Sequence, residues 1–233
     1  MIHIDASYAY LVLDIPFFVT WLLLFYFSKK TRKEQLVMSL ILLPLGSISE
    51  IIYFRDYWLP NGVWPMYFGV LPIFIEDFIF SLSIGGIGAV VYESLIKRKQ
   101  VRSRVHKHIS IVVIAVIFSI VSLGLIKLGF NSIYATSIGF FISALLILAQ
   151  RRDLFLDSIF SGLAVMIIMF LSYLILFNLT SNIGELYKKI WLLYGTPLDM
   201  RLFNIPMTEM VWGFTWGMLV GPIYEYWKDL RLR

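Results

Sequence analysis

The chain has 233 residues, of which 59% are hydrophobic and only 15% are charged, a composition that excludes an ordinary soluble globular domain. Its 20 Lys and Arg outnumber its 15 Asp and Glu, and it has no Cys, which excludes disulfides, thiolate catalysis and Cys-ligated metals. Most of its surface is therefore expected to face lipid, and any function must lie in the helices or their short loops.

Seven segments are long and apolar enough to cross a membrane as helices, which needs about 20 residues. They are 8–28, 35–54, 71–94, 109–129, 132–150, 154–179 and 205–227. The predicted fold class is all-α, a polytopic integral membrane protein with seven transmembrane helices. Pro72 and Pro206 are expected in the first turns of their helices, where a missing N–H costs nothing.

The basic residues follow alternate predicted helices. Fifteen of them lie in four segments: 29–33, 97–107, 151–152 and 228–233. The other side has only Arg55, Lys127, Lys188, Lys189 and Arg201. The positive-inside rule then predicts a multi-pass cell-membrane protein with its N-terminus outside and its C-terminus in the cytoplasm. Such a surface meets anionic lipid headgroups, and nucleic acid is not expected as a partner.

An internal repeat organises the chain. Residues 72–93 read PIFIEDFIFSLSIGGIGAVVYE and residues 206–225 read PMTEMVWGFTWGMLVGPIYE, so each copy opens with Pro, soon carries an acid and ends in Tyr-Glu. Both copies are expected to run in the same direction, as parallel repeats. The predicted organisation is a three-helix unit over 1–94, a basic cytoplasmic loop with a connector helix over 95–131, and a second three-helix unit over 132–233.

Five acidic residues are predicted at comparable depth in the outer half of the membrane: Asp14, Glu50, Glu76, Asp77 and Glu209. An ionisable side chain in hydrocarbon costs at least about 2.5 kcal/mol, so each is a candidate functional residue. No Lys or Arg lies in the middle of the same helices, and at least one acid is expected to be protonated and able to act as a general acid. The structural alternative is that single acids near helix ends act as caps.

Aromatic side chains are expected beside these acids. Glu209, Trp212 and Trp216 are spaced to share one helix face, and Phe80 lies four residues after Glu76. A carboxyl group flanked by aromatic rings suits a reaction that protonates an alkene and shelters the resulting carbocation. The candidate substrate-binding residues are therefore Phe80, Trp212 and Trp216, together with Asp14 and Glu50.

The stretch RDYWLPNGVWPMYFGVLPIFIEDFIF at 55–80 resembles the Trp-containing loop and proline-acid motif of the heterodimer-type lycopene cyclases of bacteria, archaea and fungi. The resemblance covers essentially the whole chain and is strongest over 50–93. It implies two fused three-helix units and a redox-neutral cyclisation of a carotenoid end group. The family pattern falls on Pro72, Glu76, Asp77 and Phe80 in the first unit.

In the second unit the family pattern falls on Pro206 and Glu209. The resemblance implies that Glu76 or Asp77 protonates the terminal double bond and that Glu209 removes a proton after ring closure. The sequence departs from the family pattern in two places. One extra residue separates Pro72 from its acids, and Met210 replaces a second carboxylate after Glu209.

Three other functions are weighed against cyclisation. A carotenoid hydratase would use the same protonation step, and the sequence does not separate the two. A proton-coupled transporter would also need intramembrane acids, but these are expected only in the outer half. A retinal-binding opsin would need a Lys in the last helix, and 205–227 has none. No nucleotide or metal motif occurs, so no cofactor is expected, and the three His residues lie in terminal or loop segments.

Overall fold

The computed structural model describes residues 3–59, 62–68, 71–96, 100–102 and 109–232, and it is predominantly helical. The helices are α1 (Ala6–Phe27), α2 (Arg32–Tyr53), α3 (Ile75–Ile96), α4 (Ile111–Lys127), α5 (Ser132–Gln150), the short 3-10 helix η1 (Arg152–Leu154), α6 (Phe155–Leu179), α7 (Ile183–Ile190), α8 (Met207–Val220) and α9 (Ile223–Lys228). Several helices begin with an N-cap residue whose side chain accepts a hydrogen bond from a backbone N–H group in the first turn. Asp5, Ser110 and Asn131 accept such bonds at the starts of α1, α4 and α5.

Within the described residues, five helices are long and apolar enough to cross a membrane, namely α1, α2, α3, α5 and η1–α6. Seven spans are not confirmed, because α4 has only 17 residues and α8 only 14. The expected continuous span over 205–227 is wrong in detail, since α8 ends at Val220 and α9 starts at Ile223. Pro222 lies in the turn between them, and its missing N–H removes one helical hydrogen bond.

Short antiparallel hairpins precede both α3 and α8. The strands are β1 (Pro65–Phe68), β2 (Leu71–Phe74), β3 (Gln100–Arg102), β4 (Arg201–Leu202), β5 (Ile205–Pro206) and β6 (Leu230–Leu232). They pair as β1 with β2, β3 with β6 and β4 with β5. The helix start expected at Pro72 is therefore wrong, because Pro72 lies in β2 opposite Tyr67 and α3 begins three residues later. Pro206 ends β5 and directly precedes α8.

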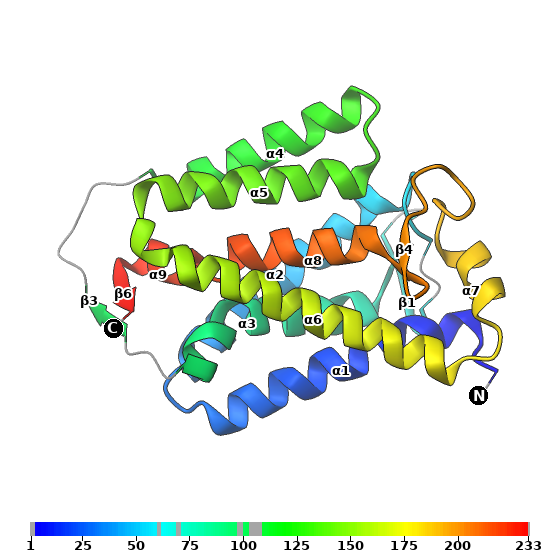
Figure 1. The fold of residues 1–233 in the computed structure, drawn as a ribbon, viewed down its shortest axis with the longest axis horizontal. Helices are drawn as coiled ribbons and strands as arrows, with labels where there is room; N and C mark the ends of the chain where they lie inside the picture. Colours follow the sequence, from blue (N-terminus) through cyan, green and yellow to red (C-terminus); the bar gives the residue numbers. More distant parts are fainter. Residues whose placement is uncertain (1–2, 60–61, 69–70, 97–99, 103–108, 233) are drawn as a thin grey trace.

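The two halves of the bundle have related packing. Helix α3 packs against α1 and α2, while α8 packs against α5 and α6, and α4 lies against α5 at the edge. Figure 1 shows both hairpins, α7 and the N-terminus at one end of the bundle, and β6 with the C-terminus at the other. Helices α3 and α8 thus start at the same end and run in the same direction, as the repeat predicts. The expected units 1–94 and 132–233, with 95–131 between them, stay a prediction.

Close backbone contact between α6 and α8 depends on glycine. A Cβ added to Gly217 would lie 2.6 Å from the carbonyl oxygen of Ser161 and 2.8 Å from the Cα of Gly162. In lipid, where helix association depends on van der Waals packing, small residues let backbones approach in this way. The contact fixes α8, and hence Glu209 near its start, against α6.

The described charged residues separate along the bundle as the topology prediction requires. The 29–33 and 151–152 segments lie at the end where α1 and α5 finish, whereas Lys127 and Arg201 lie at the hairpin end. Residues 97–99, 103–108 and 233, which carry Lys97, Arg98, Lys99, Arg104, His106, Lys107, His108 and Arg233, lie outside the described residues. Which end faces the cytoplasm stays a prediction.

Candidate functional site

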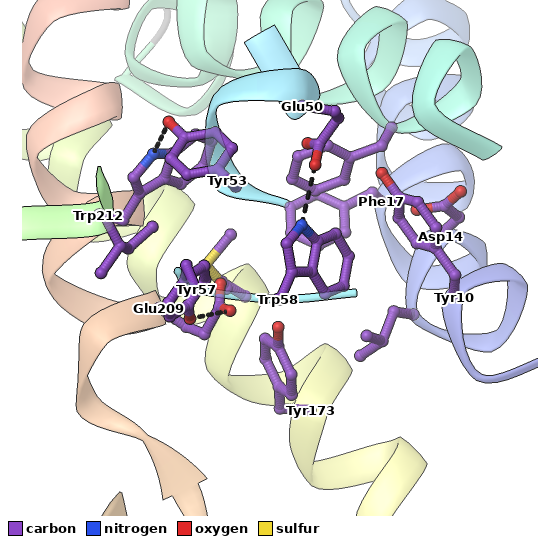
Figure 2. A pocket seen from close by; sticks show the side chains of 14 residues that line it. Tyr10, Asp14, Phe17, Glu50, Tyr53, Tyr57, Trp58, Tyr173, Glu209 and Trp212 are labelled. Atoms are coloured by element: carbon purple, nitrogen blue, oxygen red, sulfur yellow. Dashed lines mark hydrogen bonds between the residues drawn. The ribbon is translucent and has the colours of Figure 1, made fainter. Parts of the chain in front are cut away.

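A cavity of about 50 Å³ is lined by residues from several helices of the bundle, among them Glu209 in the first turn of α8. It is enclosed mainly by α1, α2, α3, α6 and α8, with the turn after α2 (Figure 2). Its lining residues are Tyr10, Leu13, Asp14, Phe17, Glu50, Tyr53, Tyr57, Trp58, Phe80, Ile133, Met169, Tyr173, Glu209 and Trp212. None of these side chains is cationic, so the charges that the described residues present to the cavity are negative.

Three of the five predicted acids line this cavity, and their surroundings differ. Asp14 is 1% exposed, and neither of its carboxylate oxygens has a hydrogen-bond partner. Glu50 accepts a hydrogen bond of 2.9 Å from the indole Nε1 of Trp58. Glu209 accepts from the Tyr57 hydroxyl and, at 3.4 Å, from Trp191 Nε1. A negative charge is therefore best supported on Glu209 and least supported on Asp14.

The adjacent pair Glu76 and Asp77 does not line the cavity. One oxygen of Glu76 accepts from the backbone N–H of Val63 at 2.7 Å, and one oxygen of Asp77 accepts from that of Phe74 at 2.7 Å. Both acids thus bind the chain that leads into α3, as helix-start caps do. Their other oxygens, Glu76 Oε2 and Asp77 Oδ1, are buried without a hydrogen-bond partner.

All five acids nevertheless form one electrostatically connected layer. Asp14 interacts with Asp77, Glu76 and Glu50, and Glu50 interacts in turn with Asp77 and Glu209. In an apolar medium, the repulsion between like charges is much larger than in water. The layer therefore disfavours simultaneous ionisation of its members.

Aromatic rings cover the apolar side of the cavity. Phe80 stacks on Trp212 with ring centroids 6.2 Å apart, and the Trp212 indole donates a 2.9 Å hydrogen bond to the Tyr53 hydroxyl. Trp216 stacks on Trp212 at 5.5 Å but lines a second, smaller cavity of about 20 Å³. The two cavities share Glu50, Phe80 and Trp212 as lining residues, so they adjoin one another.

The sequence did not identify the hydroxyl and indole donors of the site. Tyr57 and Trp58 lie in the RDYWLP motif, which was the only available signal for them. Burial, and then the adjacent Glu209 carboxylate, raise the pKa of Tyr57 well above its ordinary value, so its hydroxyl remains a donor. Tyr10 and Tyr173, from α1 and α6, gave no comparable signal because Tyr is common throughout the chain.

The expectation that buried acids are confined to the outer half is wrong. Glu93, Asp157 and Glu225 come together near the opposite end of the bundle, where α3 ends, α6 begins and α9 lies. The acid in the Tyr-Glu pair that ends each repeat belongs to this group. The sequence did not reveal this group, because its three acids lie on different helices that meet only in the folded bundle.

Residues 131–227 match the model of a protein family described as lycopene cyclase. This part of the chain, from the cap of α5 into α9, is therefore similar to the lycopene cyclase family, and it contains Glu209 and Trp212. The match falls on the second half, although the motifs of residues 50–93 carried most of the resemblance. No curated protein and no solved structure matches the chain significantly.

Proposed function

Because residues 131–227 match the lycopene cyclase family model, we propose that the protein is a membrane carotenoid cyclase. It would close a terminal ring on a linear, lycopene-type polyene. Protonation of the terminal double bond gives a carbocation, the neighbouring alkene attacks it to form a six-membered ring, and loss of a proton restores a double bond. The reaction consumes one proton and releases one, with no change in oxidation state. The observation that carries the proposal is the aromatic-lined cavity with three carboxyl groups.

We assign the proton donor to Asp14 or Glu50, the two acids of the first unit that line the cavity. A donor must be protonated and within reach of the substrate. Asp14 meets both conditions best, because no donor group supports its ionised form and the charges of Glu76 and Asp77 oppose it. This assignment replaces direct protonation by Glu76 or Asp77, which do not line the cavity.

Glu76 and Asp77 remain part of the proposed site as residues that act through others. Asp77 lies beside Tyr10, whose ring lines the cavity. It can therefore influence the protonation of the lining acids by charge and through the Tyr10 hydroxyl. Glu76 contributes repulsion toward Asp14 and holds the hairpin at Val63.

Glu209 suits the role of the base. Its carboxylate accepts from Tyr57 and Trp191, and hydrogen bonds to a charged acceptor favour the ionised form that takes up a proton. Glu209 interacts with Glu50, and Glu50 interacts with Asp14, so the base and both candidate donors belong to one connected group. The proton removed by Glu209 could return within this layer to the donor for the next cycle.

Between protonation and deprotonation, the carbocation needs stabilisation without a nucleophile. The faces of Phe80 and Trp212 supply it, since a cation over an aromatic ring gains about 2 kcal/mol or more when desolvated. Trp216 extends this surface along the adjoining cavity. The same shielding keeps water from the cation, which separates cyclisation from hydration.

The substrate must displace side chains when it enters. The cavity measures about 50 Å³, whereas an apolar cavity that binds benzene measures about 150 Å³. The adjoining cavity lies between α2, α3, α5 and α8 and is lined by Leu42, Gly46, Ile84 and Phe140. We propose that the polyene enters from the bilayer on this side, with its end group passing Trp212.

The test is the pigment profile of lycopene-accumulating cells that express this chain. A cyclic product of unchanged mass supports the cyclase, whereas a product heavier by one water supports a hydratase. Asp14→Asn, Glu50→Gln and Glu209→Gln are compared at equal protein level with Glu185→Gln, an exposed acid in α7. Loss of product in Glu209→Gln and in either lining acid of the first unit is expected, by roughly 10²-fold or more. Full activity in all three site variants would contradict the assignment.

A further inference from the structure

The second acidic group lies away from the cavity and has no part in the proposed cyclisation. One carboxylate oxygen from each of Glu93, Asp157 and Glu225 lies within 4.8 Å of the others. The three side chains are 2%, 1% and 0% exposed. We propose that these three carboxylates bind a divalent cation, Ca²⁺ or Mn²⁺, which joins α3, α6 and α9 at the end of the bundle opposite the hairpins.

Glu93 gives the strongest indication of a ligand. It is almost fully buried, one of its oxygens lies within 4.8 Å of a carboxylate oxygen of Asp157 and of Glu225, and neither oxygen has a hydrogen-bond partner. Asp157 also has one oxygen without a hydrogen-bond partner, Oδ2, whereas its Oδ1 accepts a hydrogen bond of 3.1 Å from the Ser161 hydroxyl. Buried charges in proteins are as a rule paired or bound to metals. An ion would satisfy these three oxygens at once.

Arg151, a described cation that interacts with this group, is already engaged. Arg151 interacts with Glu225 electrostatically, but its guanidinium donates to both oxygens of Asp153, at 2.9 and 2.8 Å, and to the Leu230 carbonyl at 2.6 Å. Arg151 therefore offsets part of the free-energy cost of burying a charge on Glu225. The hydrogen bonds that its guanidinium donates to described residues go to Asp153 and Leu230, and not to Glu93 or Asp157. These two acids are the ones for which an ion provides compensation.

The ligand chemistry selects the type of ion. All three ligands are carboxylate oxygens, which favour hard cations over zinc or copper. Calcium binds oxygens at about 2.3–2.6 Å, so oxygens on opposite sides of one calcium lie about 4.6–5.2 Å apart. The three oxygens lie within 4.8 Å of one another, which is compatible with that size.

The position of the site relates to the repeat. Glu93 ends the first repeated segment and Glu225 ends the second, so each unit would supply an equivalent ligand. Asp157 is the third residue of α6, and Glu34, the third residue of α2, also interacts with Glu93. An ion at this point would fasten the two units together at the end opposite the cavity. This role does not depend on the cyclase proposal.

The experiment uses the full-length protein purified in detergent and treated with a chelator. Mn²⁺ is titrated in and its binding is followed by electron paramagnetic resonance, with Ca²⁺ as competitor. Thermal unfolding is recorded at each ion concentration. We expect one Mn²⁺ per chain, displaced by Ca²⁺, and an unfolding temperature that rises with ion concentration by mass action.

Variants locate the bound ion. Glu93→Gln and Asp157→Asn should weaken Mn²⁺ binding by roughly tenfold or more, because ion affinity depends on the number of charged ligands. The exposed Glu185→Gln should bind as the unchanged protein does. If the variants do not fold, the titration of the unchanged protein still decides. Absence of stoichiometric Mn²⁺ binding, or equal binding in Glu93→Gln and Asp157→Asn, would overturn the proposal.

Discussion

The contact between α6 and α8 gives a quantitative prediction for Gly217→Ala. The added Cβ would lie 2.6 Å from the Ser161 carbonyl oxygen, whereas ordinary van der Waals contact begins at 3.4 Å. The helices must therefore separate locally by 0.8 Å, the difference between these distances, because the obstructing atoms are backbone atoms that cannot rotate away. Overpacking of this kind costs about 1–3 kcal/mol.

Gly124→Ala is the matched control. Gly124 lies inside the apolar helix α4, and a Cβ there would meet no atom within 4 Å. Both substitutions gain the same helix propensity, up to about 1 kcal/mol, so this gain cancels when the two variants are compared. Gly217→Ala should then be less stable than Gly124→Ala by about 1–3 kcal/mol in the free energy of unfolding.

The assay is reversible unfolding in mixed micelles, with helix content followed by circular dichroism as the denaturing detergent fraction rises. Pigment production by the same variants shows whether the displacement of α8 also disturbs the cavity, to which α8 contributes Glu209 and Trp212. Equal stability of the two alanine variants would refute the close-contact reasoning.

Three further predictions concern the site, the loops and the orientation. Trp58→Phe removes the 2.9 Å bond to Glu50 and should lower the free energy of unfolding by about 1–3 kcal/mol in the same assay, whereas Trp64→Phe, at an indole that is 56% exposed, should change it little. Hydrogen bonds from Arg201 hold the pKa of Asp199 below its ordinary 3.8, so this acid stabilises the fold fully above that pH and loses its contribution as the pH falls through the lower, folded value. The unchanged protein should therefore lose stability as the pH falls below 3.8, and Asp199→Asn should lack this part of the loss when unfolding is measured at graded pH. Reporter fusions at the C-terminus and within 98–108 should both indicate the cytoplasm, and an external signal from either would contradict the topology.

Patterns along the chain determined the class of protein. Long apolar segments and the low charge content indicate lipid as solvent, and the part of the chain that the structure describes has five helices with the length and hydropathy of a span. The repeat predicted that its two copies run in the same direction, and α3 and α8 both begin at the hairpin end of the bundle. The carboxyl groups also stood out in sequence, because acids in apolar segments are costly and therefore rare.

Only tertiary packing decided which of those acids share a cavity. Asp14, Glu50 and Glu209 lie on three helices far apart in sequence, and their relative rotation depends on how side chains and glycines pack. Glu76 and Asp77 turn instead toward backbone N–H groups of the hairpin, which a helix-start pattern did not reveal. The opposite group of Glu93, Asp157 and Glu225 also required the assembled bundle, because its members are adjacent only where three helix ends meet. The sequence specifies which side chains must be shielded from lipid, whereas the packing of the helices decides which residues those side chains contact in the interior.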